Sequence, residues 1–208
     1  MLTEKIFALA HYADQIVLVV LILMSIVSIA MIFERYFAIK KISAESHRVK
    51  SRIRNALQTG SIEDFADIAK DPTSVEGRAA SYALKYFKVH GEKGLEDIFN
   101  TFILTEKSDL EKFLPVLATI SSNAPYIGLL GTVLGIMKAF NDLSVAQNAG
   151  QQTVMAGIST ALIATAAGLF VAIPASIFYN YFTRKVKSTI LSIEAVKELG
   201  LAYSKMKV

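Results

Sequence analysis

The stretch TVMAGISTALIATAAGLFVAIPASIFYNYF, residues 153–182, decides the fold of this chain. It lies inside a longer run, 143–183, of 41 residues without Asp, Glu, Lys, Arg or His. At ~1.5 Å per helical residue, such a run reaches roughly 60 Å, about twice the hydrocarbon thickness of a bilayer. Gly, Ala, Ser and Thr are frequent in it, as they are in membrane helices that pack closely against other helices. The stretch therefore predicts a membrane protein whose helices pack into a larger assembly.

The overall composition favours a few membrane spans joined to water-exposed helices. Hydrophobic residues make up 53% of the chain and charged residues 19%, which is unlike a single globular core. The chain contains no Cys, so disulfides and thiolate metal sites are excluded. The net charge of +4 comes from basic residues that gather beside the apolar runs, which is typical of membrane topology rather than of nucleic-acid binding.

Two further apolar runs predict membrane helices. Residues 16–33 form 18 residues without a charge, which is too long for the core of a signal peptide and lacks a basic leader and an A-x-A pattern. Residues 113–137 form 25 residues without a charge. Pro115 suits a first helical turn, whereas Pro125 would interrupt the backbone hydrogen bonds inside the membrane. The chain is therefore expected to span the membrane three times.

The basic residues orient these spans. Segment 34–112 holds 14 Lys and Arg and the tail after Thr183 holds six, whereas the segment before the first span holds one. The positive-inside rule places the basic segments in the cytoplasm and the N-terminus outside. The expected order is a short periplasmic segment at 1–15, a membrane helix at 16–33, a cytoplasmic helical region at 34–112, a membrane helix at 113–138, a short periplasmic connection at 139–153, a membrane helix at 154–183 and a cytoplasmic C-terminal helix at 184–208.

Segment 34–112 is expected to extend the membrane helices into a cytoplasmic helical bundle. Apolar residues recur at helical spacing in 44–57, 74–87 and 95–114. The dipeptide Asp71-Pro72 and the pair Gly91 and Gly94 indicate breaks between these helices. The predicted fold class is an all-α integral membrane protein with three transmembrane helices.

The spans carry hydroxyl groups but no charged residue in their cores. A protein that moves protons alone usually places a carboxylate or His near the membrane centre, so either this chain moves no ions or a partner supplies the ionisable group. Thr132, Thr160 and Thr165 lie on faces of small residues, where a hydroxyl can bond a partner helix or a water. Each can equally bond the carbonyl one turn back, which is a purely structural role. Helix packing and kinks are expected from Pro125, Gly128, Gly131, Gly135, Gly157, Gly168 and Pro174.

Nothing in the sequence indicates an enzyme, a metal site or a cofactor. His11, His47 and His90 lie outside the spans without ligand spacing. No nucleophile–base arrangement is evident. Gly128, Gly131 and Gly135 superficially resemble a phosphate-binding loop, but the Gly-Lys-Ser/Thr ending is missing and they lie in an apolar run, so packing glycines are the better interpretation.

Three motifs together resemble one family. SSNAPYIGLLGTVLGIMKAFNDL (121–143), AGISTALIATAAGLFVAIPASIFYNYF (156–182) and IFERYFAIKK (32–41) are similar to the MotA/TolQ/ExbB proton channel family. The resemblance is to the ExbB and TolQ branch, slightly closer to ExbB. It implies a homopentameric ring in the bacterial inner membrane around an ExbD- or TolR-like single-span partner whose membrane Asp carries the proton. It further implies that ion flow drives a TonB- or TolA-like protein, with membrane lipids as neighbours.

The same resemblance implies roles for the threonines. Thr132 in GLLGTVLGI and Thr165 in LIATAAGL match the pore-lining threonines of the family. Thr160 departs from it, because GISTAL stands where the branch usually has GIAEAL, and Thr cannot titrate near neutral pH. Either the partner Asp suffices for proton transfer, or the hydroxyl-rich lining accepts Na⁺.

Several functions therefore stay open at this point. The main one is a ring subunit that, with its partner, uses the proton motive force to energise TonB- or TolA-dependent processes at the outer membrane. The alternatives are cell-envelope maintenance of the TolQ type, a sodium-driven variant and a non-conducting membrane scaffold. A secondary transporter is disfavoured, because the chain has few spans and no inverted repeat.

Overall fold

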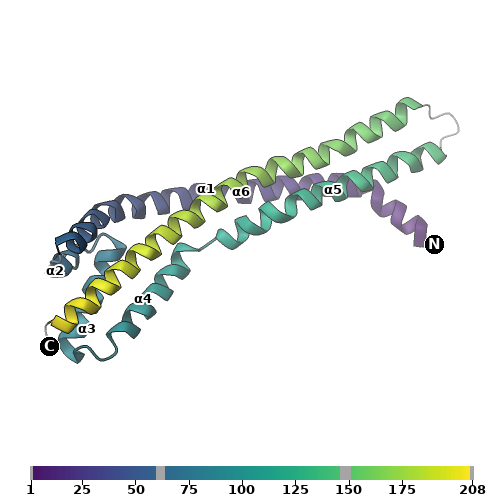
Figure 1. Ribbon diagram of the computed structural model, residues 1–208. Helices are drawn as coiled ribbons and strands as arrows, with labels where there is room; N and C mark the ends of the chain where they lie inside the picture. Colours follow the sequence, from purple (N-terminus) through teal and green to yellow (C-terminus); the bar gives the residue numbers. More distant parts are fainter. Residues whose placement is uncertain (1, 60–63, 146–150, 207–208) are drawn as a thin grey trace. The chain divides into compact units, whose positions relative to one another are not determined.

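Every secondary-structure element in the described part of the chain is a helix. The computed structural model describes residues 2–59, 64–145 and 151–206 (Figure 1). The all-helical class predicted from the sequence is confirmed. The helices are α1 (Leu2–Thr59), α2 (Asp64–Ile68), α3 (Val75–His90), α4 (Leu95–Leu110), α5 (Leu114–Val145) and α6 (Gln151–Met206).

Three of these helices are long and apolar enough to cross a membrane. The candidate spans lie within α1, α5 and α6, at Gln15–Asn55, Leu114–Ser144 and Val154–Met206. At most 33% of the most apolar window of each is buried within the chain, so most of this surface is left for lipid or other subunits. The three predicted spans thus have helical counterparts. α5 runs to Val145 and so includes the first part of the predicted connection 139–153, whose residues 146–150 lie outside the described residues.

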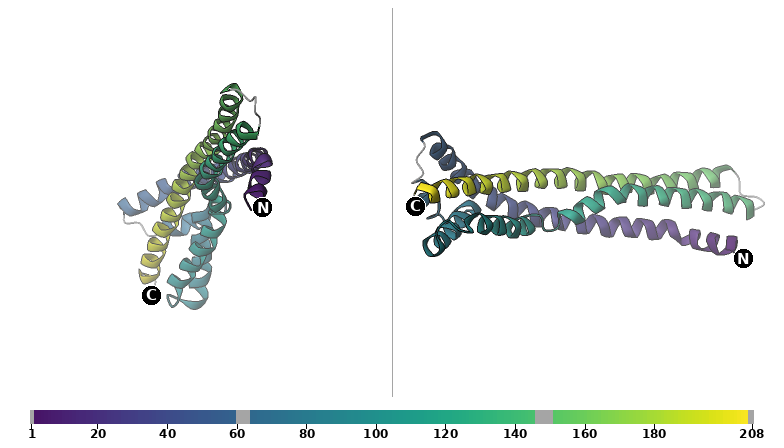
Figure 2. Two further views of the ribbon diagram at one scale, coloured as in Figure 1. Left: turned by 90° about the vertical axis from the view of Figure 1, so that its right-hand side faces the viewer. Right: turned by 60° about the horizontal axis from the view of Figure 1, so that its bottom comes forward.

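The chain folds into two compact units. Unit 1 comprises 1–33 and 113–180, and unit 2 comprises 34–112 and 181–208. In unit 1, α5 lies alongside the first part of α6 in every view (Figures 1 and 2). Its core joins α1, α5 and α6, and it is rich in alanine, which allows close helix contact. The buried residues of this core are Val17, Leu21, Ile120, Ala124, Ala164, Val171, Ala172 and Ala175.

Unit 2 has a separate core with larger side chains. Phe65 of α2, Phe99 of α4 and Ile193 of α6 are almost completely buried in it. The second half of α1 contributes Val49, and α3 contributes a run of alanines that lets its neighbours approach. The amphipathic pattern predicted for segment 34–112 therefore corresponds to helices that bury their apolar faces against one another and against the end of α6.

The helix breaks of unit 2 have local causes. Ser74 caps α3, since its Oγ accepts a hydrogen bond of 3.0 Å from the Gly77 N–H. Just before it, hydrogen bonds from the Thr73 hydroxyl and N–H hold the pKa of Asp71 below its usual range, so this turn is stabilised at neutral pH and weakened as the pH falls through that pKa. Gly91 and Gly94 adopt φ of 69° and 78° between α3 and α4, where a side chain would be strained.

The apolar pattern of 95–114 continues beyond the helix that carries it. α4 ends at Leu110 and Phe113 adopts a φ of 66°, so the last residues of the pattern belong to the break and to the start of α5. Pro115 explains the break, because it has no N–H to bond the Glu111 carbonyl and its ring would clash with that carbonyl in a continuous helix. The chain therefore stops α4 and begins α5 at Leu114, with Pro115 in the first turn.

A buried arginine holds the end of α4. Arg35 of α1 is 6% exposed, and its Nη1 donates to the carbonyl oxygens of Asp109 and Leu110 at 3.1 and 3.3 Å. Its Nε donates to Glu34 at 2.6 Å, which balances the charge. The last carbonyls of a helix lack partners within the helix and carry partial negative charge, so a guanidinium there is favourable.

Replacing Arg35 by glutamine is expected to destabilise unit 2. The terminal carbonyls of α4 would lose a charged donor in a buried place, at a cost of roughly 1.5–3 kcal/mol. The melting temperature of the protein in detergent should fall by several degrees, whereas Arg54→Gln, at an exposed position of the same helix, should change it little. Equal melting temperatures for the two variants would contradict the role given to Arg35.

Candidate functional site

Five glycines bring α5 and α6 of unit 1 into close contact. A Cβ added to Gly128 would lie 2.6 Å from the Ala164 carbonyl oxygen, and one added to Gly168 would lie 2.6 Å from the Ala124 carbonyl oxygen. Real Cβ atoms do not approach other atoms so closely, so these helices touch through their backbones. At Gly131, Gly135 and Gly157, an added Cβ would come within 2.6–2.8 Å of an alanine side chain of the facing helix.

Two threonine hydroxyls meet across this contact. Thr132 of α5 is 8% exposed, and its hydroxyl is hydrogen-bonded to the hydroxyl of Thr165 of α6. The Thr132 Oγ1 also lies 3.1 Å from the Ala161 carbonyl oxygen and 3.3 Å from that of Gly128. One hydroxyl therefore donates to the other, and the second proton has a carbonyl acceptor. We call Thr132 and Thr165 the hydroxyl pair.

The hydroxyl pair combines both roles that the sequence left open. Thr132 bonds the carbonyl one turn back, as a structural threonine does, and it also bonds the facing helix. Thr165 is half-buried, and its Oγ1 lies 3.4 Å from the Gly128 carbonyl oxygen. Each hydroxyl has one proton and two lone pairs, so the pair retains acceptor capacity beyond its internal bonds.

Thr160 lies apart from the hydroxyl pair. Its side chain is exposed, and its hydroxyl donates to the Ala156 carbonyl at 3.0 Å, one turn back on α6. It lines a cavity of about 130 Å³ between α5 and α6, which is large enough for a few waters. The other residues around the cavity are Gly135, Lys138, Ala139, Asp142, Gly157 and Ala161.

Sequence reasoning missed the two charged residues of this cavity. In the sequence, Lys138 directly follows the second uncharged run and Asp142 falls in the predicted connection 139–153, so neither indicates a site. Because α5 continues to Val145, both side chains lie on the face of Gly135, one turn apart. Among the unit 1 side chains that the structure describes, they are the only charged ones. Residues 135, 138 and 142 are spaced to share one helical face, but this face exists only if the predicted helix 113–138 continues past residue 138.

The two interior prolines lie within continuous helices. α5 continues on both sides of Pro125, and α6 continues on both sides of Pro174. Near Pro125, the hydroxyls of Ser121 and Ser122 donate to the Ala118 carbonyl at 2.9 and 3.0 Å. Side-chain hydroxyls thus supplement the backbone hydrogen bonds in this part of α5.

The described side chains show no metal centre. No three His, Cys, Asp or Glu residues among them are placed so that they could hold an ion. The side chains of His11 and His47 lie outside the described residues, so this statement does not extend to them.

Comparison with known proteins gives the family. Residues 71–195 match the MotA/TolQ/ExbB proton channel family. The chain is also 34% identical over 191 residues to the Tol-Pal system protein TolQ of Pseudomonas aeruginosa, which covers 87% of this chain and 83% of that protein. This chain belongs to the MotA/TolQ/ExbB proton channel family. It is therefore a membrane protein of a channel family, as the three apolar helices indicate.

Relatives named ExbB match a shorter part of the chain. The biopolymer transport protein ExbB of Aquifex aeolicus is 47% identical over 90 residues, which is 43% of this chain and 61% of that protein. The ExbB of Helicobacter pylori is 56% identical over 84 residues, which is 40% of this chain and 57% of that protein. The predicted ExbB and TolQ branch of the family is thus confirmed.

Proposed function

We propose that this chain is the ring subunit of an inner-membrane, ion-driven motor. In this proposal a homopentamer surrounds an ExbD- or TolR-like single-span partner, and the proton motive force acts through that partner on a TonB- or TolA-like protein. The observation that carries the proposal is the hydroxyl pair in a contact between apolar helices. The sequence has no Asp, Glu, His, Lys or Arg in 113–137 or 143–183, so a group that titrates near neutral pH at this depth has to come from another chain.

The hydroxyl pair suits a partner carboxyl that alternates between two protonation states. Thr165 is half-buried, so the hydroxyl pair is partly open to a group from a neighbouring chain. A threonine hydroxyl donates to an ionised carboxylate and accepts from a protonated one. Protonation removes the large desolvation cost of the charged acid, so the preferred place of the partner in the ring changes. Repeated protonation from the periplasm and release to the cytoplasm then moves the partner relative to the ring.

The proposed orientation follows the distribution of basic residues. Unit 2, which contains most of the Lys and Arg, lies in the cytoplasm, and the N-terminus lies in the periplasm. The cavity of Lys138, Asp142 and Thr160 then lies near the periplasmic end of α5 and α6, where ions enter.

Sodium is the second candidate ion. Four oxygen atoms converge at the hydroxyl pair, two from hydroxyls and two from the carbonyls of Gly128 and Ala161. Backbone carbonyl oxygens replace the hydration shell of the cation in potassium channels, and a hydroxyl oxygen also offers lone pairs. This arrangement favours a sodium-driven variant as the alternative to proton use.

Co-purification with the partner tests the proposed assembly. The chain would be expressed with an ExbD- or TolR-like single-span protein from the same organism and extracted in mild detergent, and the mass of the complex would be measured by native mass spectrometry. The proposal predicts one complex that contains both chains, with this chain in excess and in five copies. A chain that stays monomeric in detergent mild enough to preserve other membrane complexes would contradict it.

Charge changes at the cavity should alter ion entry in opposite directions. Asp142→Asn removes a carboxylate that attracts cations, so cation flux through the assembled complex should fall several-fold at low ionic strength. Lys138→Gln removes the opposing charge and should raise the flux. Both effects should shrink as salt is added, because screening weakens them. An equal loss of flux in both variants would indicate a structural role instead.

A further inference from the structure

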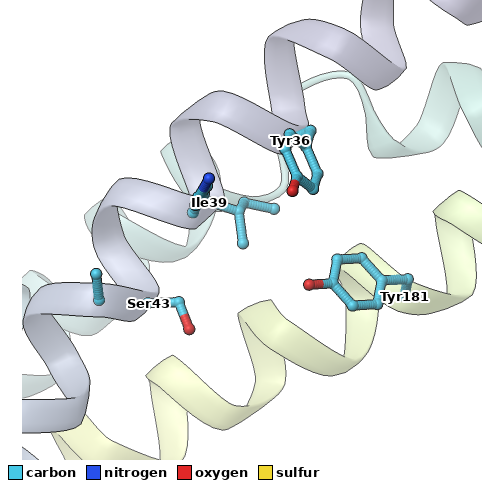
Figure 3. Close-up of a pocket in the computed structure, with 6 residues that line it drawn as sticks. Tyr36, Ile39, Ser43 and Tyr181 are labelled. Atoms are coloured by element: carbon cyan, nitrogen blue, oxygen red, sulfur yellow. The ribbon is translucent and has the colours of Figure 1, made fainter.

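We propose that a cavity between α1 and α6 in unit 2 binds the phosphate of an anionic phospholipid head group. The cavity has a volume of about 430 Å³ and is separate from the hydroxyl pair (Figure 3). The proposal is independent of the motor function, because it rests on the donors that line this cavity and on where they lie along the two helices. The lining residues are Tyr36, Ile39, Lys40, Ser43, Ala44 and Tyr181.

Three hydroxyl groups are available to a ligand in this cavity. Figure 3 shows the hydroxyls of Tyr36, Ser43 and Tyr181 turned toward the space between the two helices. Within the described part of the chain, none of the three makes a hydrogen bond. Donors without partners on a partly apolar surface suit a ligand that has only acceptor oxygens, as a phosphate diester does.

The charges at this place are positive. Lys40 lines the cavity, and its Nζ lies 5.8 Å from the centre of the Tyr36 ring. Lys185 of α6 is not a lining residue, but its Nζ lies 5.8 Å from the centre of the ring of Tyr181, which is one. The lining residues include no acidic side chain. Two ammonium groups held over tyrosine rings therefore flank a group of hydroxyl donors, which favours an anion.

The position along the sequence selects a lipid rather than a soluble anion. Tyr36 comes three residues after the uncharged run 16–33, and Tyr181 lies two residues before the end of the uncharged run 143–183. Tyrosines at such positions are typical of the boundary between hydrocarbon and water. Seven of the 22 Lys and Arg lie between Arg35 and Arg54, and basic groups just outside a span attract anionic lipids.

The cavity also offers an apolar surface for an acyl chain. The apolar part of the lining is Ile39 and Ala44, and Phe37, which lies outside the lining on the same turn of α1, is 65% exposed and open to hydrocarbon. A head group held by hydroxyls and ammonium, with hydrocarbon along exposed aromatic and aliphatic side chains, matches the amphipathic character of a phospholipid.

Lipid retention by the intact complex tests this site. The triple variant Tyr36→Phe, Lys40→Gln, Tyr181→Phe keeps both rings and removes two hydroxyls and one charge. The matched control is Tyr82→Phe with Lys85→Gln, which makes the same kinds of change at exposed positions of α3. Both are purified from equal mixtures of phosphatidylglycerol and phosphatidylcholine, and the lipid bound to each protein is counted by native mass spectrometry.

The wild type and the control should retain phosphatidylglycerol in preference to phosphatidylcholine. In the triple variant, the ratio of bound phosphatidylglycerol to bound phosphatidylcholine should be about fivefold lower. Equal preference in the triple variant and the control would overturn the proposal. The proposal would also be overturned if inorganic phosphate raised the melting temperature of the wild type as much as phosphatidylglycerol does, because the site would then bind a soluble anion equally well. If the triple variant does not fold, Lys40→Gln alone, at an exposed side chain, makes the same comparison against Lys85→Gln.

Discussion

Gly128→Leu should prevent α5 and α6 from packing and leave no stable unit 1. The hydrogen at this Cα faces the Ala164 carbonyl, and even a Cβ would approach that oxygen to 2.6 Å. Leucine adds three more carbons at a place where the Gly168 backbone also lies close. Relief requires the helices to separate, which breaks the hydroxyl pair as well. Overpacking of a tight core typically costs 1–3 kcal/mol or more, and here a backbone has to move.

The loss of stability should grow with the size of the side chain at position 128, and it should be confined to positions in the contact between α5 and α6. Gly128→Ala should lower the melting temperature in detergent, and Gly128→Leu should abolish the folded peak in size-exclusion chromatography. Val133→Leu enlarges a side chain of the same helix that is 48% exposed, and it should behave as wild type in the same two measurements. A Gly128→Leu protein that melts at the wild-type temperature would show that α5 and α6 do not touch there.

Removing the hydroxyls of the pair should stop energy transduction without preventing assembly. Thr165→Ala, or Thr165→Val with a shape closer to threonine, leaves the helix contact but takes away the group that we propose to meet the partner carboxyl. A hydrogen bond to a charged group contributes about 1.5–3 kcal/mol, so partner-dependent ion flux should fall at least tenfold. Thr165→Ser, which keeps the hydroxyl, should restore most of the flux.

Thr132 and Thr165 should behave as a unit. Because their hydroxyls bond each other, Thr132→Val combined with Thr165→Val should cost little more flux than either change alone. Thr119→Val is the matched control. Thr119 lies on α5, as Thr132 does, and its hydroxyl donates to the Pro115 carbonyl of the same helix at 2.9 Å. Normal flux in the Thr165 variants, with the complex assembled, would refute the assignment.

The sequence predicts the helices and their apolar runs well, because each depends on local composition. A run without charges and a periodicity of 3.6 residues identify a membrane helix without knowledge of its neighbours. The glycines at 128, 131 and 135 likewise reveal a smooth face before any partner is known. The apolar pattern alone does not give the end of α4, because the pattern continues to Leu114. Pro115 ends the helix earlier, since it disrupts the helical turn that precedes it.

The site was harder to predict, because it depends on two helices at once. The spacing of residues places Thr132 on a small-residue face, but only the register of α5 against α6 brings it to Thr165 rather than to Thr160. The cavity of Lys138 and Asp142 depends in addition on how far α5 extends. The sequence does not show this end of the helix, because the residues there are polar and resemble a loop.

Ion flux into proteoliposomes that hold this chain with its single-span partner tests the central claim most directly. Gradients of H⁺ and Na⁺ would be applied separately, with the wild-type partner and with its membrane Asp changed to Asn. The account predicts flux under a proton gradient that disappears with the Asn partner, whereas a fully assembled complex that conducts neither ion, or conducts equally well with the Asn partner, would contradict it.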